Sequence, residues 1–212
     1  MIMRRIDELL ERYPALEVCR GEIENAAEEL CACFARGGKL LICGNGGSAA
    51  DAIHIAGELL KGFLKKRPLS PEKKEAMRRA SPGIPEETLS GLQEGLPAIP
   101  LPEESALLTA FGNDVDPVLA YAQGVNALGK PGDVLLAIST SGNAENCLAA
   151  VLTAKGLGIR TVALTGEGGG RLGKAADLAI RVPEKETFKV QELHLPVYHA
   201  LCAAAEERFF PE

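Results

Sequence analysis

Short apolar runs alternate with segments of helical periodicity through most of this sequence, and small or polar residues follow each run. The runs cover residues 39–43, 98–101, 133–139, 160–165 and 178–182. Strands that are apolar along their whole length are buried on both faces, and strands that alternate with helices form parallel sheets. The pattern therefore predicts an α/β fold, a doubly wound parallel sheet flanked by helices.

Two regions depart from this alternation. Residues 1–36 have helical periodicity that Pro14 interrupts, and they predict N-terminal helices that extend the core. Residues 64–96 are rich in proline and charge, and we interpret them as an excursion from the core with one short helix near 72–79. We expect a single domain over residues 1–212, with further helices at 49–63, 104–111, 117–128, 144–155, 172–176 and 188–209.

The composition excludes several classes of protein. With 46% hydrophobic residues the chain can bury a core, so a disordered chain is excluded. The formal charge of −6 and the 4% aromatic content argue against a nucleic-acid coat or an anionic-membrane binder. No apolar stretch approaches the roughly 20 residues of a membrane span, and the N-terminus lacks the apolar segment of a signal peptide. We expect a cytoplasmic protein without nucleic-acid or membrane partners.

Two loops that follow predicted strands have the composition of an anion site. In a doubly wound sheet, such loops and the helix starts after them face one crevice. The first loop offers small residues that let a ligand approach the backbone, Asn45, Gly46, Gly47 and Ser48. The second offers three adjacent hydroxyls that suit a phosphate ester, Ser139, Thr140 and Ser141. The alternative is that both loops only form turns and helix caps.

All three histidines of the chain lie in two predicted helices. His54 and Glu58 are four residues apart and share one helix face, so they could chelate a metal, act together as acid and base, or form a surface pair. The last helix carries Gln191 and His199, eight residues apart. The pair Asn113-Asp114 is predicted to lie in a loop that could bind sugar hydroxyls, and the alternative is a turn that caps a helix.

Four segments together resemble one known family. GNGGSAADAIHIAGEL, ISTSGN, VALTGEGGG and VQELHLPVYH resemble the SIS (sugar isomerase) domain proteins, and among them the phosphoheptose isomerases. The resemblance covers residues 15–63 and 97–210. It implies an SIS fold, a homotetramer with N-terminal helices at the subunit interface, and the isomerisation of a phosphorylated sugar. The implied reaction converts sedoheptulose 7-phosphate to D-glycero-D-manno-heptose 7-phosphate, assisted by one zinc ion per active site.

The resemblance also implies roles for individual residues. The metal-ligand positions are His54, Glu58, Gln191 and His199, with Glu58 as general base and His199 as general acid. The sugar-contacting segments are Asn45 to Gly47 and Asn113-Asp114, and Ser139, Thr140 and Ser141 form the phosphate clamp. We expect Ser48, Glu58 and Gln191 to contact the substrate as well.

Two departures from the family pattern leave the sugar open. Ala144 stands where the family commonly has a further serine, and the excursion at 64–96 is longer than usual. The reaction could therefore involve a different sugar phosphate. A third possibility is a non-catalytic SIS module that binds a phosphosugar as a regulator or serves as an adaptor.

Overall fold

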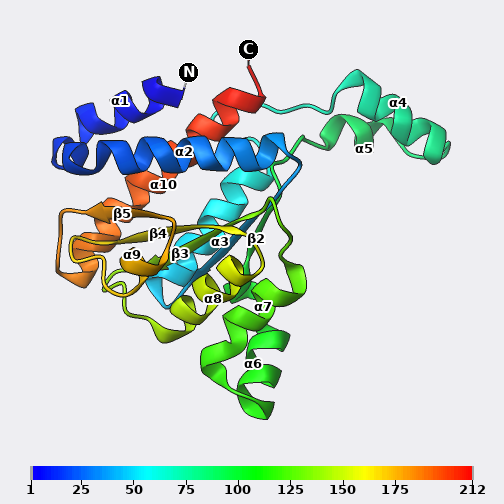
Figure 1. Cartoon of the computed structure of the whole chain (residues 1–212). Helices are drawn as coiled ribbons and strands as arrows, with labels where there is room; N and C mark the ends of the chain where they lie inside the picture. Colours follow the sequence, from blue (N-terminus) through cyan, green and yellow to red (C-terminus); the bar gives the residue numbers. More distant parts are fainter. Residues whose placement is uncertain (1, 212) are drawn as a thin grey trace.

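The computed structural model describes residues 2–211, and a five-stranded parallel sheet forms its centre (Figure 1). The strands are β1 (Leu40–Gly44), β2 (Ala98–Pro100), β3 (Val134–Ser139), β4 (Arg160–Gly166) and β5 (Leu178–Val182). Their order is β2-β1-β3-β4-β5, so the chain moves outward from β1 to β2 and then crosses back to β3. This reversal between β1 and β3 is the point at which doubly wound sheets bind ligands. The predicted α/β fold is confirmed.

Both faces of the sheet are buried, as the apolar strands require. Along β1, Leu40 and Ile42 belong to one buried cluster, whereas Leu41 and Cys43 belong to another. Successive side chains of a strand point to opposite faces, so each cluster fills one side of the sheet. Helices must cover both sides, because an uncovered face would expose this apolar surface to water.

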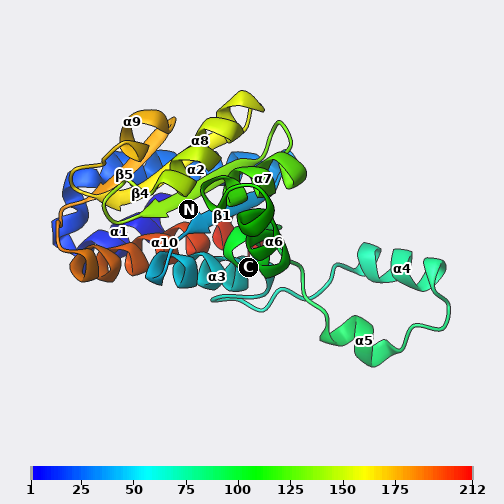
Figure 2. The same ribbon diagram turned by 90° about the horizontal axis from the view of Figure 1, so that it is seen from below.

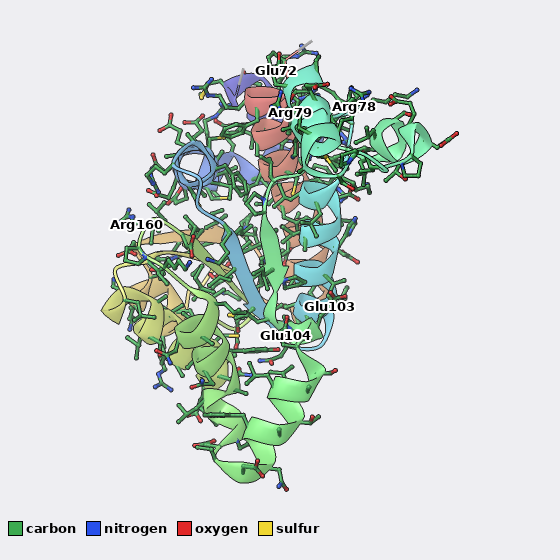
Figure 3. All side chains as sticks on the ribbon, turned by 90° about the vertical axis from the view of Figure 1, so that its right-hand side faces the viewer. Glu72, Arg78, Arg79, Glu103, Glu104 and Arg160 are labelled. Carbon is green, nitrogen blue, oxygen red and sulfur yellow. The ribbon has the colours of Figure 1, made fainter. Side chains whose placement is uncertain are left out.

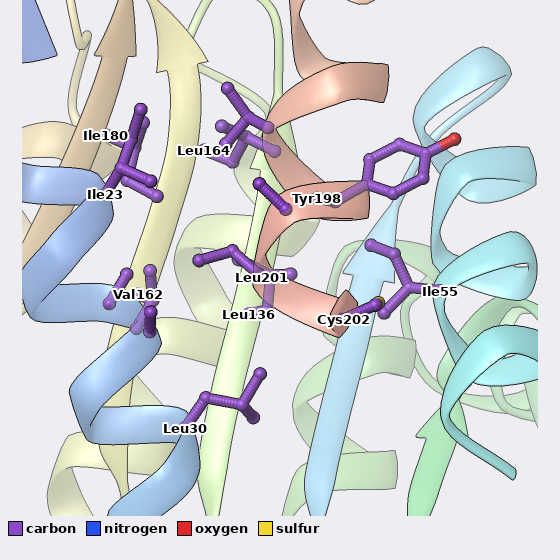
Figure 4. Close-up of a cluster of buried hydrophobic side chains, with 14 of the residues drawn as sticks. Ile23, Leu30, Ile55, Leu136, Val162, Leu164, Ile180, Tyr198, Leu201 and Cys202 are labelled. Carbon is purple, nitrogen blue, oxygen red and sulfur yellow. The ribbon is translucent and has the colours of Figure 1, made fainter. Parts of the chain in front are cut away.

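The first face is covered by the N-terminal and C-terminal helices. The strands are contacted by α2 (Arg20–Ala35), α3 (Gly47–Leu60) and α10 (Thr187–Phe209), and α1 (Ile2–Arg12) packs on α2 and α10 and is joined to α2 by the 3-10 helix η1 (Pro14–Cys19). Figure 4 shows Ile23 of α2, Ile55 of α3 and Leu201 of α10 around the strands in one buried cluster. Pro14 separates α1 from α2, as the sequence predicts, and α10 remains helical through Pro196.

The second face is covered by the helices from the middle of the chain. They are η2 (Leu101–Glu103), α6 (Ser105–Asp114), η3 (Pro117–Leu119), α7 (Ala120–Leu128), α8 (Glu145–Gly156) and α9 (Leu172–Ala175). Tyr121, Val125 and Val151 from α7 and α8 belong to its buried cluster. Because α3 and α8 begin directly after β1 and β3, their N-termini lie at the same edge of the sheet (Figure 1).

Residues 64–96, which we call the arm, project from the rest of the chain (Figure 2). The arm contains α4 (Pro71–Ala80) and α5 (Glu86–Gly91). The Ser70 hydroxyl accepts a hydrogen bond from Lys73 N and caps α4, whose residues are all at least partly exposed. Arg78 donates to Glu86 at 2.8 Å and joins the two helices, and Figure 3 shows it beside Arg79 on the arm. The sequence predicts α4 but misses α5.

A buried ion pair anchors the base of the arm. Arg67 and Glu206 are both about 1% exposed, and Arg67 Nε donates to Glu206 Oε1 at 2.8 Å. Glu206 also accepts the backbone N–H groups of Phe63 and Leu64, each at 2.8 Å. Arg67 donates in addition to the carbonyl of Leu59 at the end of α3. The arm therefore joins the C-terminal end of α3 to α10 through fully satisfied polar groups.

Two smaller expectations can be compared with the structure. Throughout residues 2–211, no helix has the combination of length and apolar composition needed to cross a bilayer. Most of the six cysteines lie in apolar runs of the sequence, which favours small buried side chains, and all six are buried free thiols in the structure (Cys19, Cys31, Cys33, Cys43, Cys147 and Cys202).

Candidate active site

The loop after β1 approaches the start of α3 through a backbone that only glycine adopts easily. Gly46 has φ of +56°, in the left-handed region that disfavours other residues. A Cβ on Gly47 would collide with the side-chain amide of Gln191, so α10 lies directly against the N-terminus of α3. Asn45 is exposed at this edge, whereas Ser48 is buried, so the four predicted residues of the loop differ in their exposure to solvent.

The loop after β3 carries the three predicted hydroxyls in different environments. Ser139 is buried, Thr140 is half-buried and Ser141 is exposed. Gly142 has φ of +66°, and a Cβ there would collide with the carbonyl of Gly169. Ser141 Oγ accepts from Asn143 N at 3.2 Å and thereby orders the turn into α8. Ala144, the N-cap of α8, makes no side-chain capping bond, and Asn146 Oδ1 takes up the N–H of Cys147 only, so the N–H groups of Glu145 and Asn146 remain as donors to an anion.

A reciprocal amide pair that the sequence did not predict joins these two loops. Asn45 Nδ2 donates to Asn146 Oδ1 at 2.8 Å, and Asn146 Nδ2 donates to Asn45 Oδ1 at 2.9 Å. Asn146 Oδ1 also accepts from the backbone N–H of Cys147. The predicted sugar-contacting residue Asn45 is therefore held by α8 through both polar groups of its side chain.

His54, Glu58 and His199 come together on the facing surfaces of α3 and α10. His54 Nε2 lies 3.2 Å from Glu58 Oε1 and 3.4 Å from His199 Nε2. Lys61 Nζ donates to the other carboxylate oxygen of Glu58 at 2.9 Å. We call His54, Glu58 and His199 the His–Glu cluster. Helical spacing explains the contact between His54 and Glu58, whereas the contact with His199 depends on how the two helices pack.

The electrostatic environment suits an ionised carboxylate beside a neutral imidazole. Burial works to raise the pKa of Glu58, but the Lys61 ammonium and His54 hold it below its usual range. Burial, together with the neighbouring His54, lowers the pKa of His199. Glu58 can therefore accept a proton at neutral pH, and the neutral ring of His199 has one N–H that can donate a proton and one nitrogen that can accept one.

Two further residues extend the His–Glu cluster into the core. The Tyr198 hydroxyl lies 3.0 Å from His54 Nδ1 and donates to Asp51 Oδ1 at 3.2 Å. Burial raises the pKa of the Asp51 carboxyl. Asp51 precedes His54 by three residues on the same face of α3, and this spacing is the sequence signal that indicates it.

An open cavity borders the His–Glu cluster. Its volume is about 660 Å³, and its lining includes Arg12 and Tyr13 near the end of α1, Phe63 after α3, and Pro196 and His199 of α10. His199 is the member of the His–Glu cluster that lines it, so the cluster can be reached from this side.

Gln191 and the pair Asn113-Asp114 lie apart from the His–Glu cluster within one chain. Gln191 contacts Gly47, and it precedes His199 by eight residues, which is about 12 Å along a helix. Asn113 and Asp114 are the last two residues of α6, so the prediction that they form a loop is wrong. The helix continues past Gly112 because its last turn closes with the bond from Val115 N to Phe111 O. The Asn113 amide donates to the neighbouring Asp114 carboxylate.

The donor atoms of the His–Glu cluster are of the types that bind zinc, and two of their three pairwise spacings can be compared with a zinc site. Ligand atoms at about 2.1 Å in a tetrahedron lie about 3.4 Å from one another, close to the two distances measured from His54 Nε2. In the described part of the chain, no three His, Cys, Asp or Glu side chains form a group that could hold a metal ion by themselves. The pairs therefore fit zinc, but one chain as it stands does not assemble the full ligand set.

Comparison with protein-family models shows two matches along the chain. An SIS domain model matches residues 4–96 and a second SIS domain model matches residues 108–204. The two matches leave residues 97–107 between them, which include β2, and together they contain β1, β3, β4 and β5.

Two similar proteins and one similar solved structure are described as phosphoheptose isomerases. The chain is 40% identical to the phosphoheptose isomerase of Methylibium petroleiphilum over 93% of this chain and 88% of that protein. It is 38% identical to that of Laribacter hongkongensis over 95% of this chain and 91% of that protein. The phosphoheptose isomerase structure from Neisseria gonorrhoeae superposes with a TM-score of 0.74 at 31% identity and covers 97% of each chain. With this fold and this degree of identity, the chain belongs to the phosphoheptose isomerase family of SIS-domain proteins.

Proposed function

We propose that the protein is an aldose–ketose isomerase that converts sedoheptulose 7-phosphate to the corresponding aldoheptose 7-phosphate. The observation that carries the proposal is the His–Glu cluster, in which a carboxylate and an imidazole from distant parts of the chain meet beside an open cavity. The relatives that are 38–40% identical over nine-tenths of the chain support the same reaction and the same sugar.

The residues of the His–Glu cluster can carry both proton transfers of this reaction. The Glu58 carboxylate removes a proton from C1 of the ketose, and the electron pair forms the double bond of an enediol while the C2 oxygen takes a proton from His199. His199 then takes the proton of the C1 hydroxyl, and Glu58 returns its proton to C2. The sum is an exchange of the carbonyl between two carbons without net gain or loss of atoms.

We propose zinc as the metal at the His–Glu cluster. His54, Glu58 and His199 would hold it, and when bound it would act as a Lewis acid that stabilises negative charge on the sugar oxygens. The support is the donor types and the two pairwise spacings. Gln191, the fourth ligand that the family resemblance implies, would have to come from another copy of the chain, because its own copy holds it against Gly47.

We propose that the phosphate of the substrate binds between Ser139, Thr140, Ser141 and the N-terminus of α8. These hydroxyls and the free N–H groups at the helix start are donors that suit a phosphate ester. Ala144 supplies no hydroxyl there, so the binding relies on the three residues of the loop and on the backbone.

The length of α3 between Glu58 and the sheet edge that carries the phosphate clamp supports the proposal of a homotetramer with shared active sites. Glu58 follows Gly47 by 11 residues of α3, which corresponds to about 16 Å along a helix. A seven-carbon chain with its phosphate ester spans roughly 10 Å at the advance per bond of an extended chain. The phosphate clamp of one copy would therefore serve the His–Glu cluster of another.

The direct test is to incubate the purified protein with a panel of ketose and aldose phosphates and to follow their exchange by NMR. We expect turnover of sedoheptulose 7-phosphate, and loss of turnover after treatment with a chelator. Turnover of a different sugar phosphate would keep the reaction class and correct the sugar. No exchange with any member of the panel, metal-loaded or metal-free, would contradict the proposal and favour a non-catalytic phosphosugar binder.

A further inference from the structure

Tyr198 reaches from the core to the His–Glu cluster through its hydroxyl alone. Its ring is 1% exposed and extends from α10 toward α3 beside Ile55, with the hydroxyl at the far end (Figure 4). The hydroxyl lies 3.2 Å from Asp51 Oδ1 and 3.0 Å from His54 Nδ1. It therefore connects a buried carboxylate to the ring nitrogen of His54 that faces away from Glu58.

The direction of these hydrogen bonds follows from the number of protons available. A phenol has one proton to donate, and the Asp51 carboxyl, although burial raises its pKa, is ionised at mildly alkaline pH and can then only accept. The proton of Tyr198 therefore points to Asp51, and the phenol oxygen accepts the hydrogen bond from His54. Nδ1 of His54 must then carry the ring proton, so Nε2 has a bare lone pair.

The bare lone pair on His54 Nε2 faces the other two residues of the His–Glu cluster. It faces Glu58 Oε1 at 3.2 Å and His199 Nε2 at 3.4 Å. The lone pair can face this carboxylate in the metal-free protein because the Lys61 ammonium donates to the other oxygen of Glu58 at 2.9 Å and partly neutralises its charge. The protonated tautomer at Nε2 would instead bond directly to Glu58 and withhold the lone pair from a metal.

We propose that Tyr198 and Asp51 are positioning residues that hold His54 in the Nδ1–H tautomer and so present its bare Nε2 to Glu58 and His199. The effect of this tautomer on catalysis rests on the proposed function. The tautomer itself is a property of the metal-free protein and can be measured without substrate. Partners of this kind orient a histidine ligand and strengthen its binding to a metal.

Packing alone does not explain the tyrosine. A phenylalanine at position 198 would fill the same space and keep the edge-to-face contacts with the rings of His54 and His199. The side chain of His54 is 42% exposed, so the core does not fix its orientation. Within the described residues, the hydroxyl of Tyr198 is the one group recorded in a hydrogen bond with Nδ1 of His54.

Nitrogen-15 NMR of the imidazole rings in the metal-free protein tests the inference, because the shifts of the two ring nitrogens distinguish the tautomers. The chain has only three histidines, so assignment by single substitutions is practical. We expect His54 to be the Nδ1–H tautomer in the parent protein at mildly alkaline pH. Tyr198→Phe should release this preference, and Asp51→Ala should reverse it, because the freed phenol proton can then point to Nδ1. Asp51→Asn, which keeps an acceptor oxygen, should restore the parent tautomer.

Zinc affinity, measured by competition with a chelator, gives a second readout that does not depend on activity. We expect Tyr198→Phe to weaken zinc binding about 10- to 100-fold. Tyr121→Phe is the matched control, since Tyr121 is also buried and its hydroxyl donates to the carbonyl of Gly44. It should leave the His54 tautomer and the zinc affinity unchanged.

The outcomes separate this inference from the proposed function. An Nε2–H tautomer in the parent protein would overturn the inference, as would a Tyr198→Phe variant with unchanged tautomer and zinc affinity. The expected tautomers in a protein that isomerises no sugar phosphate would support the inference and contradict the proposed function. The expected tautomers with unchanged zinc affinity would overturn the role toward the metal.

Discussion

Nε2 of His54 and Nε2 of His199 lie 3.4 Å apart although 145 positions separate the two residues in the sequence. The contact exists because α3 and α10 cover the same face of the sheet, with Ala52 and Ala56 of α3 and Cys202 of α10 in one buried cluster. Small side chains at these positions let two helices approach closely. The packing of the core thus brings a histidine of the last helix to the His–Glu pair of α3.

Substitution of His199 by alanine should abolish most turnover without unfolding the protein. The imidazole is half-buried at the surface of a cavity, so its loss removes a proton donor and little packing. General acid catalysis contributes about 10²- to 10⁴-fold, and we expect kcat to fall by this factor. Circular dichroism and the oligomeric state should match the parent protein. Turnover within a factor of two of the parent would show that His199 has another role.

Mixed oligomers should reveal whether an active site draws on two copies of the chain. One variant, Glu58→Gln, lacks the base, and the other, Ser139→Ala with Ser141→Ala, lacks two clamp hydroxyls. If clamp and base come from different copies, random reassembly of the two variants should restore about a quarter of the parent activity in a symmetric oligomer. Activity that stays at the level of the separate variants would show that one chain contains the whole site.

Loss of the reciprocal amide pair should weaken substrate binding more than turnover. Asn146→Ala removes both hydrogen bonds that hold the side chain of Asn45. At about 1 kcal/mol per hydrogen bond, we expect KM to rise roughly tenfold or more, with a smaller change in kcat. Asn126→Ala on the exposed surface of α7 is the control. If Asn146→Ala raises KM by the same factor in the parent protein and in the Asn45→Ala variant, the two asparagines do not act as a unit.

Protonation of His194 should make the protein less stable in acid. The ring is fully buried, neither nitrogen has a hydrogen-bond partner among residues 2–211, and burial lowers its pKa from 6.5 to about 4 against a smaller opposing effect of the Thr165 backbone. The unfolded chain binds this proton near pH 6.5 and the folded chain only near pH 4, so stability is lost as the pH falls through this window. The shift corresponds to about 3 kcal/mol. Urea unfolding of the parent and of His194→Leu should show this dependence in the parent alone. An identical slope in both would exclude His194 as its source.

The ion pair at the base of the arm should be costly to break from one side. Arg67→Met leaves the buried carboxylate of Glu206 without its charged partner, although two backbone N–H groups still donate to it. We expect a loss of about 3 kcal/mol or more in the free energy of unfolding. Arg78→Met breaks an exposed pair within the arm and should cost less than about 1 kcal/mol. Similar urea midpoints for the two variants would show that the buried pair does not anchor the arm.

The strands and the helix pair His54–Glu58 could be predicted because their signals are local. Leu40 to Cys43 is apolar without interruption, and four-residue spacing places two side chains on one helix face. Helix α5 could not be predicted, since its six residues bury only Leu89 and give no periodicity. The sequence predicts a helix that ends at residue 111 and a loop at Asn113, but α6 continues to Asp114 because its last turn closes with the hydrogen bond from Val115 N to Phe111 O.

Contacts between distant elements required the structure. The hydroxyl of Tyr198 meets Asp51 across 147 positions, and Asn146 meets Asn45 across 101. In the sequence, Tyr198 looks like an ordinary core residue and Asn146 like an ordinary helix-cap residue. Their roles follow from how α3, α8 and α10 cross the sheet, which periodicity does not encode.

The most direct test of the account follows the proton that Glu58 is proposed to move. Sedoheptulose 7-phosphate is incubated in deuterated water with the parent protein or with Glu58→Gln, and the products are analysed by NMR. We expect the parent to form an aldoheptose phosphate that carries deuterium at C2, and Glu58→Gln to form almost none. Formation of the same product at the parent rate by Glu58→Gln would contradict the account.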